Sequence, residues 1–318
     1  MNILVTGGSG FIGSHFIEEI FKRNDIIKIY NLDANTYASN KNLPFEFDDR
    51  YQKLTMDICA SYFPNQKSYF ESLNLDYVIH FAAESHVDNS IKGPKKFIDT
   101  NINGTFNLIE MFKYTNIKKF LHVSTDEVFG SLTSKESNFN INSPYRPNSP
   151  YAASKAASDL LVRSYIQTYS FPAIITNCSN NFGSRQFPEK LIPVCINKLK
   201  NKEKIPLYGN GSNIRDWIYV KDHVNALINI LLDGNIGKQY LIGGNNEMSN
   251  IQLIQLIVDT YEIITNKKVD WDWFEYVTDR KGHDFRYSID MTEFLTEFPN
   301  FKLSDFNKNL EKTIQSYL

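Results

Sequence analysis

Two adjacent carboxylates near the middle of the chain raise the first chemical question. Asp126 and Glu127 stand in the stretch STDEVFG (124–130), directly after the apolar run KFLHV. Neighbouring acids at the end of a buried strand repel one another and resist desolvation, which separates their pKa values. Such a pair can supply both a base and an acid to one reaction. The structural alternative is that Asp126 caps a turn and Glu127 is solvated.

A tyrosine and a lysine four residues apart form a second candidate group. In SPYAASKAASDLL, Tyr151 and Lys155 occupy positions i and i+4 at the start of a predicted helix, so their side chains share one face. The ammonium and the positive helix N-terminus both favour the phenolate, which predicts a base for a sugar hydroxyl. On an arbitrary surface helix the same spacing carries no chemistry, so the prediction depends on what precedes it.

A glycine-rich loop, TGGSGFIG, follows the first predicted strand. Gly8, Gly10 and Gly13 satisfy G-x-G-x-x-G, and Gly7 adds a further glycine. Such a loop brings backbone amides and a helix N-terminus up to a pyrophosphate. Asp33 ends the second predicted strand, where an acid binds the adenosine ribose hydroxyls and repels a 2′-phosphate. The order of strand, loop, helix and acid predicts an NAD site; a glycine-rich turn without a ligand is the alternative.

The elements that must position these groups alternate along the first half of the chain. Short β-branched runs are followed by longer amphipathic stretches, a pattern typical of an α/β fold with a Rossmann-type, doubly wound parallel sheet. The expected strands are NILVT, IIKIYNLD, YQKLTMDI, LDYVIHFAA, KKFLHVST and FPAIITNCSN, and the expected helices are GSHFIEEIFKR, about 87–114 and one that begins at Ser149-Pro150.

Beyond residue 181 the strand and helix signals become less regular. This change predicts a smaller mixed substrate domain after the first one. We expect an NAD-binding domain over 1–181 and a second, substrate-binding region over 182–318, with 213–232 packing back on the first domain and a cleft shared between the two.

Composition excludes several other classes of protein. The 318 residues include 34 basic and 36 acidic side chains, so there is no basic excess of the kind that binds nucleic acid. Cys59, Cys178 and Cys195 lack disulfide or zinc spacing, which favours a reducing, cytoplasmic setting. We expect no export signal, membrane anchor or metal site, because no apolar run approaches membrane-spanning length and His86 has no second ligand at useful spacing.

Together the motifs resemble the extended short-chain dehydrogenase/reductase family, and within it the nucleotide-sugar 4,6-dehydratases, above all those that act on dTDP-glucose. The resemblance runs nearly end to end, and its motifs are HFAAESHVDNS, STDEVFG, YAASK, SNNFG with QFPEKLIP, RDWIYV and GHD. It implies an NAD-dependent lyase that converts a nucleoside-diphosphate glucose to the 4-keto-6-deoxy sugar and water, on the route to deoxysugars such as rhamnose.

The resemblance also implies individual roles. Tyr151 would accept the C4 hydroxyl proton with Lys155 beside it, Glu127 would remove the C5 proton, Asp126 would protonate the departing C6 hydroxyl, and Thr125 would contact the C4 oxygen. The implied cofactor-binding residues are Gly7, Gly10, Phe11, Ile12, Gly13, Asp33, Ala34, Asn35, Thr36, Asp57, Ile58, Phe81, Ala82, Ala83, Thr100, Ser124, Tyr151, Lys155 and Asn181. The implied substrate-binding residues are Ser85, Thr125, Asn180, Lys190, Leu191, Pro206, Tyr208, Arg215, Asn250, Arg280 and His283.

Three positions depart from the family pattern and leave the nucleotide base open. Ser184 and Lys281 stand where the family usually has proline, and Phe285 stands where a basic residue is common. UDP-glucose therefore remains close behind dTDP-glucose. A 4-epimerase would leave the two acids without a task, and a non-catalytic nucleotide sensor would not need Tyr151 and Lys155. The family also implies a homodimer with a four-helix contact, made by the helices at about 87–114 and 150–169.

Overall fold

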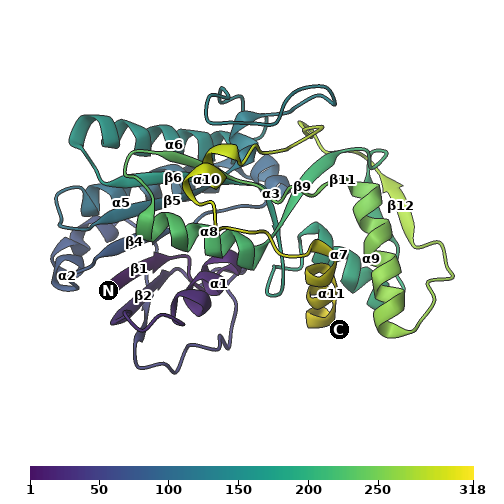
Figure 1. Cartoon of the computed structure of the whole chain (residues 1–318), viewed down its shortest axis with the longest axis horizontal. Coiled ribbons are helices and arrows are strands. Elements are labelled where there is room, and N and C mark those ends of the chain that lie inside the picture. The colour runs from purple at the N-terminus through teal and green to yellow at the C-terminus, as the bar shows by residue number, and fades with distance from the viewer.

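A seven-stranded parallel sheet forms the centre of the larger part of the molecule, and the computed structural model describes all residues from 1 to 318 (Figure 1). The strand order is β10-β6-β5-β4-β1-β2-β3, the doubly wound order 3-2-1-4-5-6 with one strand added beside β6. This confirms the predicted fold class. The strands are β1 (Asn2–Thr6), β2 (Lys28–Asp33), β3 (Tyr51–Thr55), β4 (Tyr77–His80), β5 (Lys119–Thr125), β6 (Ala173–Cys178) and β10 (Gln239–Ile242).

Each face of this sheet is covered by helices and has its own apolar core. In β1, Ile3 and Val5 face one core and Leu4 faces the other, because successive strand side chains point to opposite faces. Burial on both faces explains why the strands are nearly continuous apolar runs. The helices are α1 (Phe11–Ile20) and α8 (Val220–Asp233) on one face, and α2 (Lys67–Ser72), α5 (Thr105–Phe112) and α6 (Pro150–Tyr169), with the 3₁₀ turn η1 (Phe63–Gln66), on the other.

Helix α6 begins where the sequence predicts. The hydroxyl of Ser149 accepts a hydrogen bond from the backbone amide of Ala152 at 3.1 Å, and Pro150 occupies the first turn. The helix ends at Ser170, which adopts a left-handed conformation with φ +53°. A buried N-cap fixes the start of α6, which carries Tyr151 in its first turn and Lys155 one turn further on.

The single helix predicted over about 87–114 is divided in the structure. Gly93 and Pro94 interrupt it, because the proline ring cannot continue the preceding helix and glycine supplies the bend. A π-helical turn then precedes α5, and such turns often occur at functional sites. The successive segments are α3 (Val87–Lys92), α4 (Pro94–Phe97), η2 (Ile98–Gly104) and α5 (Thr105–Phe112).

The smaller part of the molecule has its own core and two short sheets. One sheet has the order β11-β9-β7 and the other pairs β12 with β8. Its helices pack around buried aliphatic residues such as Ile196, Leu253 and Leu310. The elements are β7 (Asn180–Phe182), β8 (Ile205–Tyr208), β9 (Ile214–Tyr219), β11 (Glu247–Ser249), β12 (Phe274–Val277), α7 (Leu191–Lys200), α9 (Asn250–Thr265) and α11 (Phe306–Tyr317).

The chain returns to the larger part after it has entered the smaller one. Helix α8 packs on α1, β10 extends the large sheet beside β6, and α10 (Thr292–Glu297) packs on β10. The division at 181/182 stays a prediction that describes chain order. No helix is both long and apolar enough to cross a bilayer.

We predict that Leu227→Ala in α8 lowers the free energy of unfolding by about 2–5 kcal/mol, because the side chain is fully buried against the core that α1 also lines. Asn225→Ala, on the exposed side of the same helix, should change it by less than about 0.5 kcal/mol. Urea unfolding of both variants checks this. Equal effects of the two substitutions would contradict the packing of α8.

Candidate functional site

The predicted cofactor residues gather at the carboxyl edge of the large sheet. In a parallel sheet all carboxyl ends meet at one edge, which is where α/β proteins bind nucleotides. The residues lie after β1 (Gly7, Gly10, Phe11, Ile12, Gly13), at the end of β2 and just after it (Asp33, Ala34, Asn35, Thr36), after β3 (Asp57, Ile58), after β4 (Phe81, Ala82, Ala83), in η2 (Thr100), in β5 (Ser124), on α6 (Tyr151, Lys155) and in β7 (Asn181).

The glycine loop after β1 is shaped so that side chains are excluded. Gly7 has φ +70°, and a Cβ there would lie 2.7 Å from the amide nitrogen of Ala82. A Cβ at Gly13 would lie 2.4 Å from the carbonyl oxygen of Gly7. Gly8 has a different task, because its Cβ would meet Asn31 of β2 at 2.4 Å. Gly7 and Gly13 therefore keep the loop turn tight, whereas Gly8 lets the loop pack on β2.

Asp33 at the end of β2 is buried and already hydrogen-bonded. One carboxylate oxygen accepts from the amide of Ser9 at 2.9 Å, and the other accepts from the amide of Asn35 at 2.8 Å and the hydroxyl of Ser39 at 3.0 Å. The carboxylate thus ties the glycine loop to the loop after β2. Sequence reasoning missed Ser9 and Ser39, although Ser9 lies within the glycine motif.

These features fit a bound dinucleotide. The tight glycine loop leads directly into the N-terminus of α1, which presents backbone amides of the kind that bind a pyrophosphate, and Asp33 ends β2 at the place of a ribose. At the other end, the buried hydroxyl of Ser124 has no hydrogen-bond partner within the protein. A buried polar atom without a partner is costly, so Ser124 favours a ligand group beside β5.

The two carboxylates lie where β5 runs into the 3₁₀ turn η3 (Asp126–Phe129). Thr125 caps this turn, since its hydroxyl accepts from the amide of Glu127 at 3.3 Å. Asp126 is 1% exposed, and one of its carboxyl oxygens has no partner. Glu127 is half-buried and lines a cavity between the larger and the smaller part of the molecule. The structural alternative is therefore wrong for Asp126, because Thr125 caps the turn and Asp126 is buried, whereas Glu127 is only half-buried and lines the cavity.

Electrostatics separates the two acids in a definite order. Burial, and then the charge of Glu127, raises the pKa of Asp126 well above its usual value. Burial also raises the pKa of Glu127, but the positive charges of Arg215 and Lys190 oppose this rise. The arrangement favours Asp126 as the protonated member and Glu127 as the member that ionises first.

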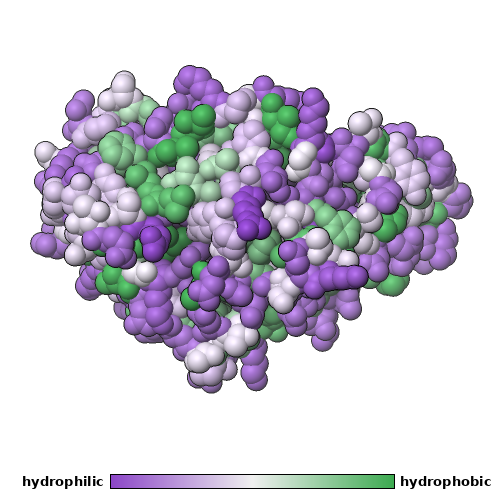
Figure 2. Space-filling view, turned by 90° about the horizontal axis from the view of Figure 1, so that it is seen from above, coloured by the Kyte–Doolittle hydropathy of each residue, from purple (hydrophilic) through white to green (hydrophobic).

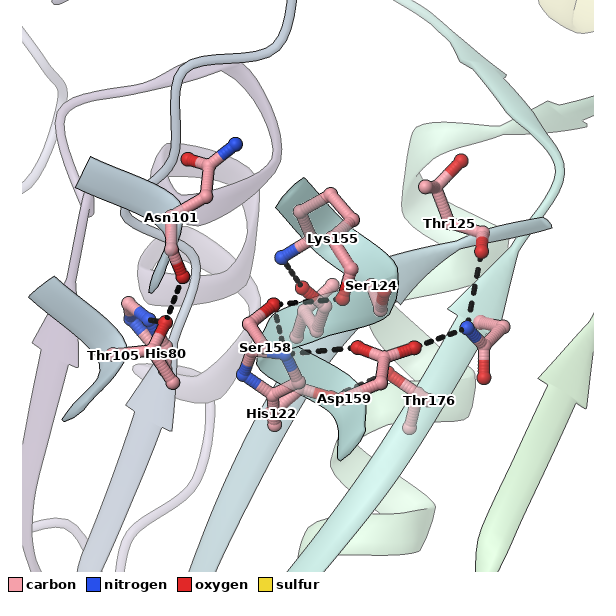
Figure 3. A network of polar contacts seen from close by, with 12 residues as sticks. His80, Asn101, Thr105, His122, Ser124, Thr125, Lys155, Ser158, Asp159 and Thr176 are labelled. Carbon is pink, nitrogen blue, oxygen red and sulfur yellow. Dashed lines mark hydrogen bonds and ion pairs between the residues drawn. The ribbon is translucent and has the colours of Figure 1, made fainter. Parts of the chain in front are cut away.

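Tyr151 and Lys155 are both buried in the first turns of α6 (Figure 3 labels Lys155). The ammonium of Lys155 donates to the carbonyl of Val123 in β5 at 2.9 Å. Burial, and then the charge of Glu127, raises the pKa of Tyr151 well above its usual value, against a hydrogen bond from Thr125. Desolvation is the largest influence on this pKa and raises it, so the predicted preference for the phenolate is not the net result.

A cavity between the two parts of the molecule brings the predicted substrate residues together. It is lined by all of them except Thr125, namely Ser85, Asn180, Lys190, Leu191, Pro206, Tyr208, Arg215, Asn250, Arg280 and His283. Glu127 reaches the same cavity. His86, interpreted from the sequence as a loop or pocket-wall residue, also lines the cavity. Sequence reasoning left out other lining residues, including Asp88, Gln186, Glu189 and Tyr287; the quoted motifs HFAAESHVDNS and QFPEKLIP contained the first three.

Three cations of the cavity are held in place by the protein. Lys190 donates to the carbonyl of Ser85 at 2.9 Å. Arg215 donates to the carbonyl of Asp284 at 3.0 Å. Arg280 forms an ion pair of 3.3 Å with Asp88 across the cavity. Guanidinium groups make forked contacts with phosphate oxygens, so this wall suits a diphosphate.

Aromatic rings support the two arginines. The guanidinium of Arg280 lies 4.9 Å above the ring of Tyr208, and that of Arg215 lies 4.2 Å above the ring of Tyr287. Across the cavity, Asn180 has a buried side-chain oxygen without a partner. The cavity thus combines positive charge, stacked rings and unpaired polar groups, as expected for a site that binds a charged sugar nucleotide.

The comparisons with known proteins agree with this site. The sequence model of the GDP-mannose 4,6 dehydratase family matches residues 4–299. The dTDP-glucose 4,6-dehydratase of Escherichia coli is 43% identical, over 100% of this chain and 93% of the relative, and that of Neisseria meningitidis serogroup B is 42% identical, over 99% and 93%. The crystal structure of DesIV, a dTDP-glucose 4,6-dehydratase from Streptomyces venezuelae with NAD and TYD bound, superposes with a TM-score of 0.92 at 38% identity, covering 100% of this chain and 97% of that chain.

We predict that Asp126→Asn stabilises the unliganded protein at neutral pH. The folded-state pKa of Asp126 lies above its unfolded value, so the carboxyl group favours folding below a pH of about 4 and loses this contribution as pH rises through the folded pKa. The gain in unfolding free energy of the variant over the wild type should therefore increase with pH, as measured by urea unfolding at several pH values.

Asp290→Asn is the control of opposite sign. Hydrogen bonds from Thr292 lower the pKa of Asp290, so its contribution to stability is present above the unfolded pKa and is lost at low pH. This variant should lose stability at neutral pH. A pH-independent effect of Asp126→Asn would contradict the raised pKa.

Proposed function

The chain belongs to the GDP-mannose 4,6 dehydratase family, and from that premise we propose that it converts a nucleoside-diphosphate glucose to the 4-keto-6-deoxyglucose derivative and water. dTDP-glucose is the first proposed substrate, because relatives more than 40% identical over nearly the whole chain carry that name. UDP-glucose is the second. The observation that carries the proposal is the pair Asp126 and Glu127 at the end of β5, with Glu127 facing the cavity.

The proposed cofactor is NAD. The glycine loop, Asp33 and the unpaired hydroxyl of Ser124 support it, as does the name of the DesIV structure. When bound, NAD supplies a positively charged acceptor that takes a hydride from C4 of the sugar and returns it to C6. Asp33 favours NAD over NADP, because a 2′-phosphate would meet its carboxylate.

In the first step Tyr151 accepts the proton of the C4 hydroxyl. The hydrogen bond from Thr125 stabilises the phenolate, and the protonated Lys155 one turn further along α6 adds positive charge on the same side. Because burial raises the pKa of Tyr151, this base needs the positive charge of the complete site. The 4-ketone that forms makes the neighbouring C5 proton acidic.

In the second step the two carboxylates act in turn. Glu127, the readier to ionise, takes the proton from C5. Asp126, kept protonated by burial and by the charge of Glu127, gives a proton to the C6 hydroxyl, which leaves as water. The hydride held by NAD would then add at C6 while Glu127 returns its proton to C5. Transfer of the proton from Tyr151 to Asp126 through solvent restores both groups, so the net change is the loss of one water.

The test is an incubation of the purified protein with dTDP-glucose and UDP-glucose in parallel, without added reductant. Loss of water by mass and the alkali-induced absorbance of a 4-keto sugar should appear with at least one donor and identify the base. Epimerised sugar of unchanged mass would support a 4-epimerase. Bound NAD without turnover of either donor would support a sensor.

We predict that Glu127→Gln lowers kcat by at least about 10²-fold, since it removes a general base, while C4 oxidation persists. The measurement is the absorbance of reduced NAD on the enzyme together with dehydrated product.

Asp126→Asn should slow the loss of water more than the exchange of the C5 proton in deuterated solvent. Equal slowing of both would contradict the division of labour.

Tyr151→Phe serves as the control for these two variants. It blocks the earlier C4 step, so neither reduced NAD nor C5 exchange should accumulate. Normal reduction of NAD by this variant would show that another group is the base.

We also propose a homodimer through a four-helix contact and a cytoplasmic location. Figure 2 shows apolar side chains gathered on part of the face seen from above, the side on which α6 lies in Figure 1. Ile98 on η2, Phe106 on α5 and Leu160 on α6 are 49%, 43% and 55% exposed. The free thiols of all three cysteines support a reducing compartment.

We predict that Leu160→Asp shifts the protein from dimer to monomer in sedimentation velocity runs, because a carboxylate would be desolvated in the contact. Ile263→Asp on α9, at an 80% exposed position outside the proposed contact, should leave the dimer intact. A wild type that sediments as a monomer would overturn this proposal.

A further inference from the structure

A buried polar network surrounds the part of α6 that carries Lys155, as Figure 3 shows. Its centre is Asp159, which lies one helical turn after Lys155 and is 1% exposed. The carboxylate accepts from Nε2 of His122 at 3.1 Å, from the hydroxyl of Tyr145 at 3.0 Å and from the side-chain amide of Asn177 at 3.0 Å. A buried carboxylate with three donors is fully anchored.

One arm of this network reaches the backbone of the catalytic segment. The side-chain nitrogen of Asn177 in β6 donates both to Asp159 and to the carbonyl of Thr125, the latter at 3.0 Å. Thr125 is followed directly by Asp126. Asp159 is therefore linked through a single residue, Asn177, to the backbone at the end of β5, directly before the carboxylates of Asp126 and Glu127.

A second arm acts through charge on Lys155. The ammonium donates to the carbonyl of Val123 and forms no ion pair of 4 Å or less. Burial lowers the pKa of Lys155, and the charge of Asp159 is the largest influence that raises it, ahead of Cys178 in β6. Asp159 thus offsets part of the desolvation of the catalytic ammonium.

We propose that Asp159 is a positioning residue of the site: it holds the catalytic end of β5 against α6 through Asn177, and it supplies a buried negative charge one helical turn from Lys155. The proposal rests on the proposed function for its kinetic part only. Its titratable neighbours are His122 from β5, Tyr145 from the loop before α6, and Lys155 from α6 itself.

The local structure can accommodate an amide in place of the carboxylate. Nδ1 of His122 has no partner, so the ring can carry its hydrogen there and accept at Nε2 from an amide at position 159. Asp159→Asn therefore removes the charge while one contact is re-formed. Tyr145→Phe is the matched control, because it deletes one hydrogen bond to the same carboxylate, keeps the charge and does not touch Thr125.

The first test needs no substrate and measures melting temperature from pH 7 to about 9.5, below the pH at which an unfolded tyrosine ionises, because burial raises the pKa of Tyr145 in the folded protein. Asp159→Asn should melt below the wild type, and the gap should narrow as pH rises, because Asp159 stabilises only the protonated form of Lys155. The gap for Tyr145→Phe should stay constant. A gap for Asp159→Asn that does not narrow would overturn the charge part of the proposal.

The second test uses turnover of the sugar nucleotide. Asp159→Asn should lower kcat by about tenfold to a hundredfold with KM changed less than about twofold, and should move the alkaline limb of the kcat profile to lower pH. Asn177→Ser, which cuts the link to Thr125 and keeps the charge, should lower kcat without moving that limb. Tyr145→Phe should do neither.

The outcomes separate the failure of this inference from the failure of the proposed function. A wild type without dehydration would remove the proposed function, whereas the melting-temperature test would still stand. An unaltered kcat in both Asp159→Asn and Asn177→Ser, with an active wild type, would overturn the positioning role. If Asp159→Asn does not fold, an unaltered kcat in Asn177→Ser alone would overturn it.

Discussion

The desolvation of charged groups at the carboxyl edge of the parallel sheet is the constraint on which the rest of the site depends. Asp126, Tyr151 and Lys155 are all nearly excluded from water. Burial raises the pKa of Asp126 and Tyr151 and lowers the pKa of Lys155, so it favours the neutral form of each group. No single partner compensates this desolvation free energy. The burial of apolar side chains in two separate cores, one on each face of the sheet, offsets it and holds β5 and α6 in place.

The catalytic groups stand on rigid elements of the larger part. The acids and the tyrosine lie on a strand end, a 3₁₀ turn and the first turn of a capped helix. The cations that suit a diphosphate come from the smaller part: Lys190 precedes α7, Arg215 lies in β9 and Arg280 follows β12. Rigid elements hold the reacting groups at fixed distances, which catalysis requires.

The sequence was sufficient for the fold class, the strand order of the first half and the neighbourhood of the site. Periodicity located the buried strands, and Ser149-Pro150 located the start of α6, because both signals are local. It was not sufficient for the break of the helix at Gly93-Pro94, since helical periodicity continues on both sides of the interruption. Nor could spacing show that burial dominates the pKa of Tyr151, because desolvation depends on tertiary packing from distant segments.

The path of the chain has a consequence for how the protein can be divided. β10 follows the smaller part in the sequence and yet covers the outer side of β6, while α8 covers α1. A fragment that ended at residue 181 would leave β6 as an unprotected edge strand and α1 without its cover, both of which promote aggregation. The larger part is therefore not an autonomous module that could be transplanted by a single cut. The chain crosses between the two parts five times, after β6, before α8, after β10, before α10 and before α11, and exchanges of the substrate-binding part must preserve all of these crossings.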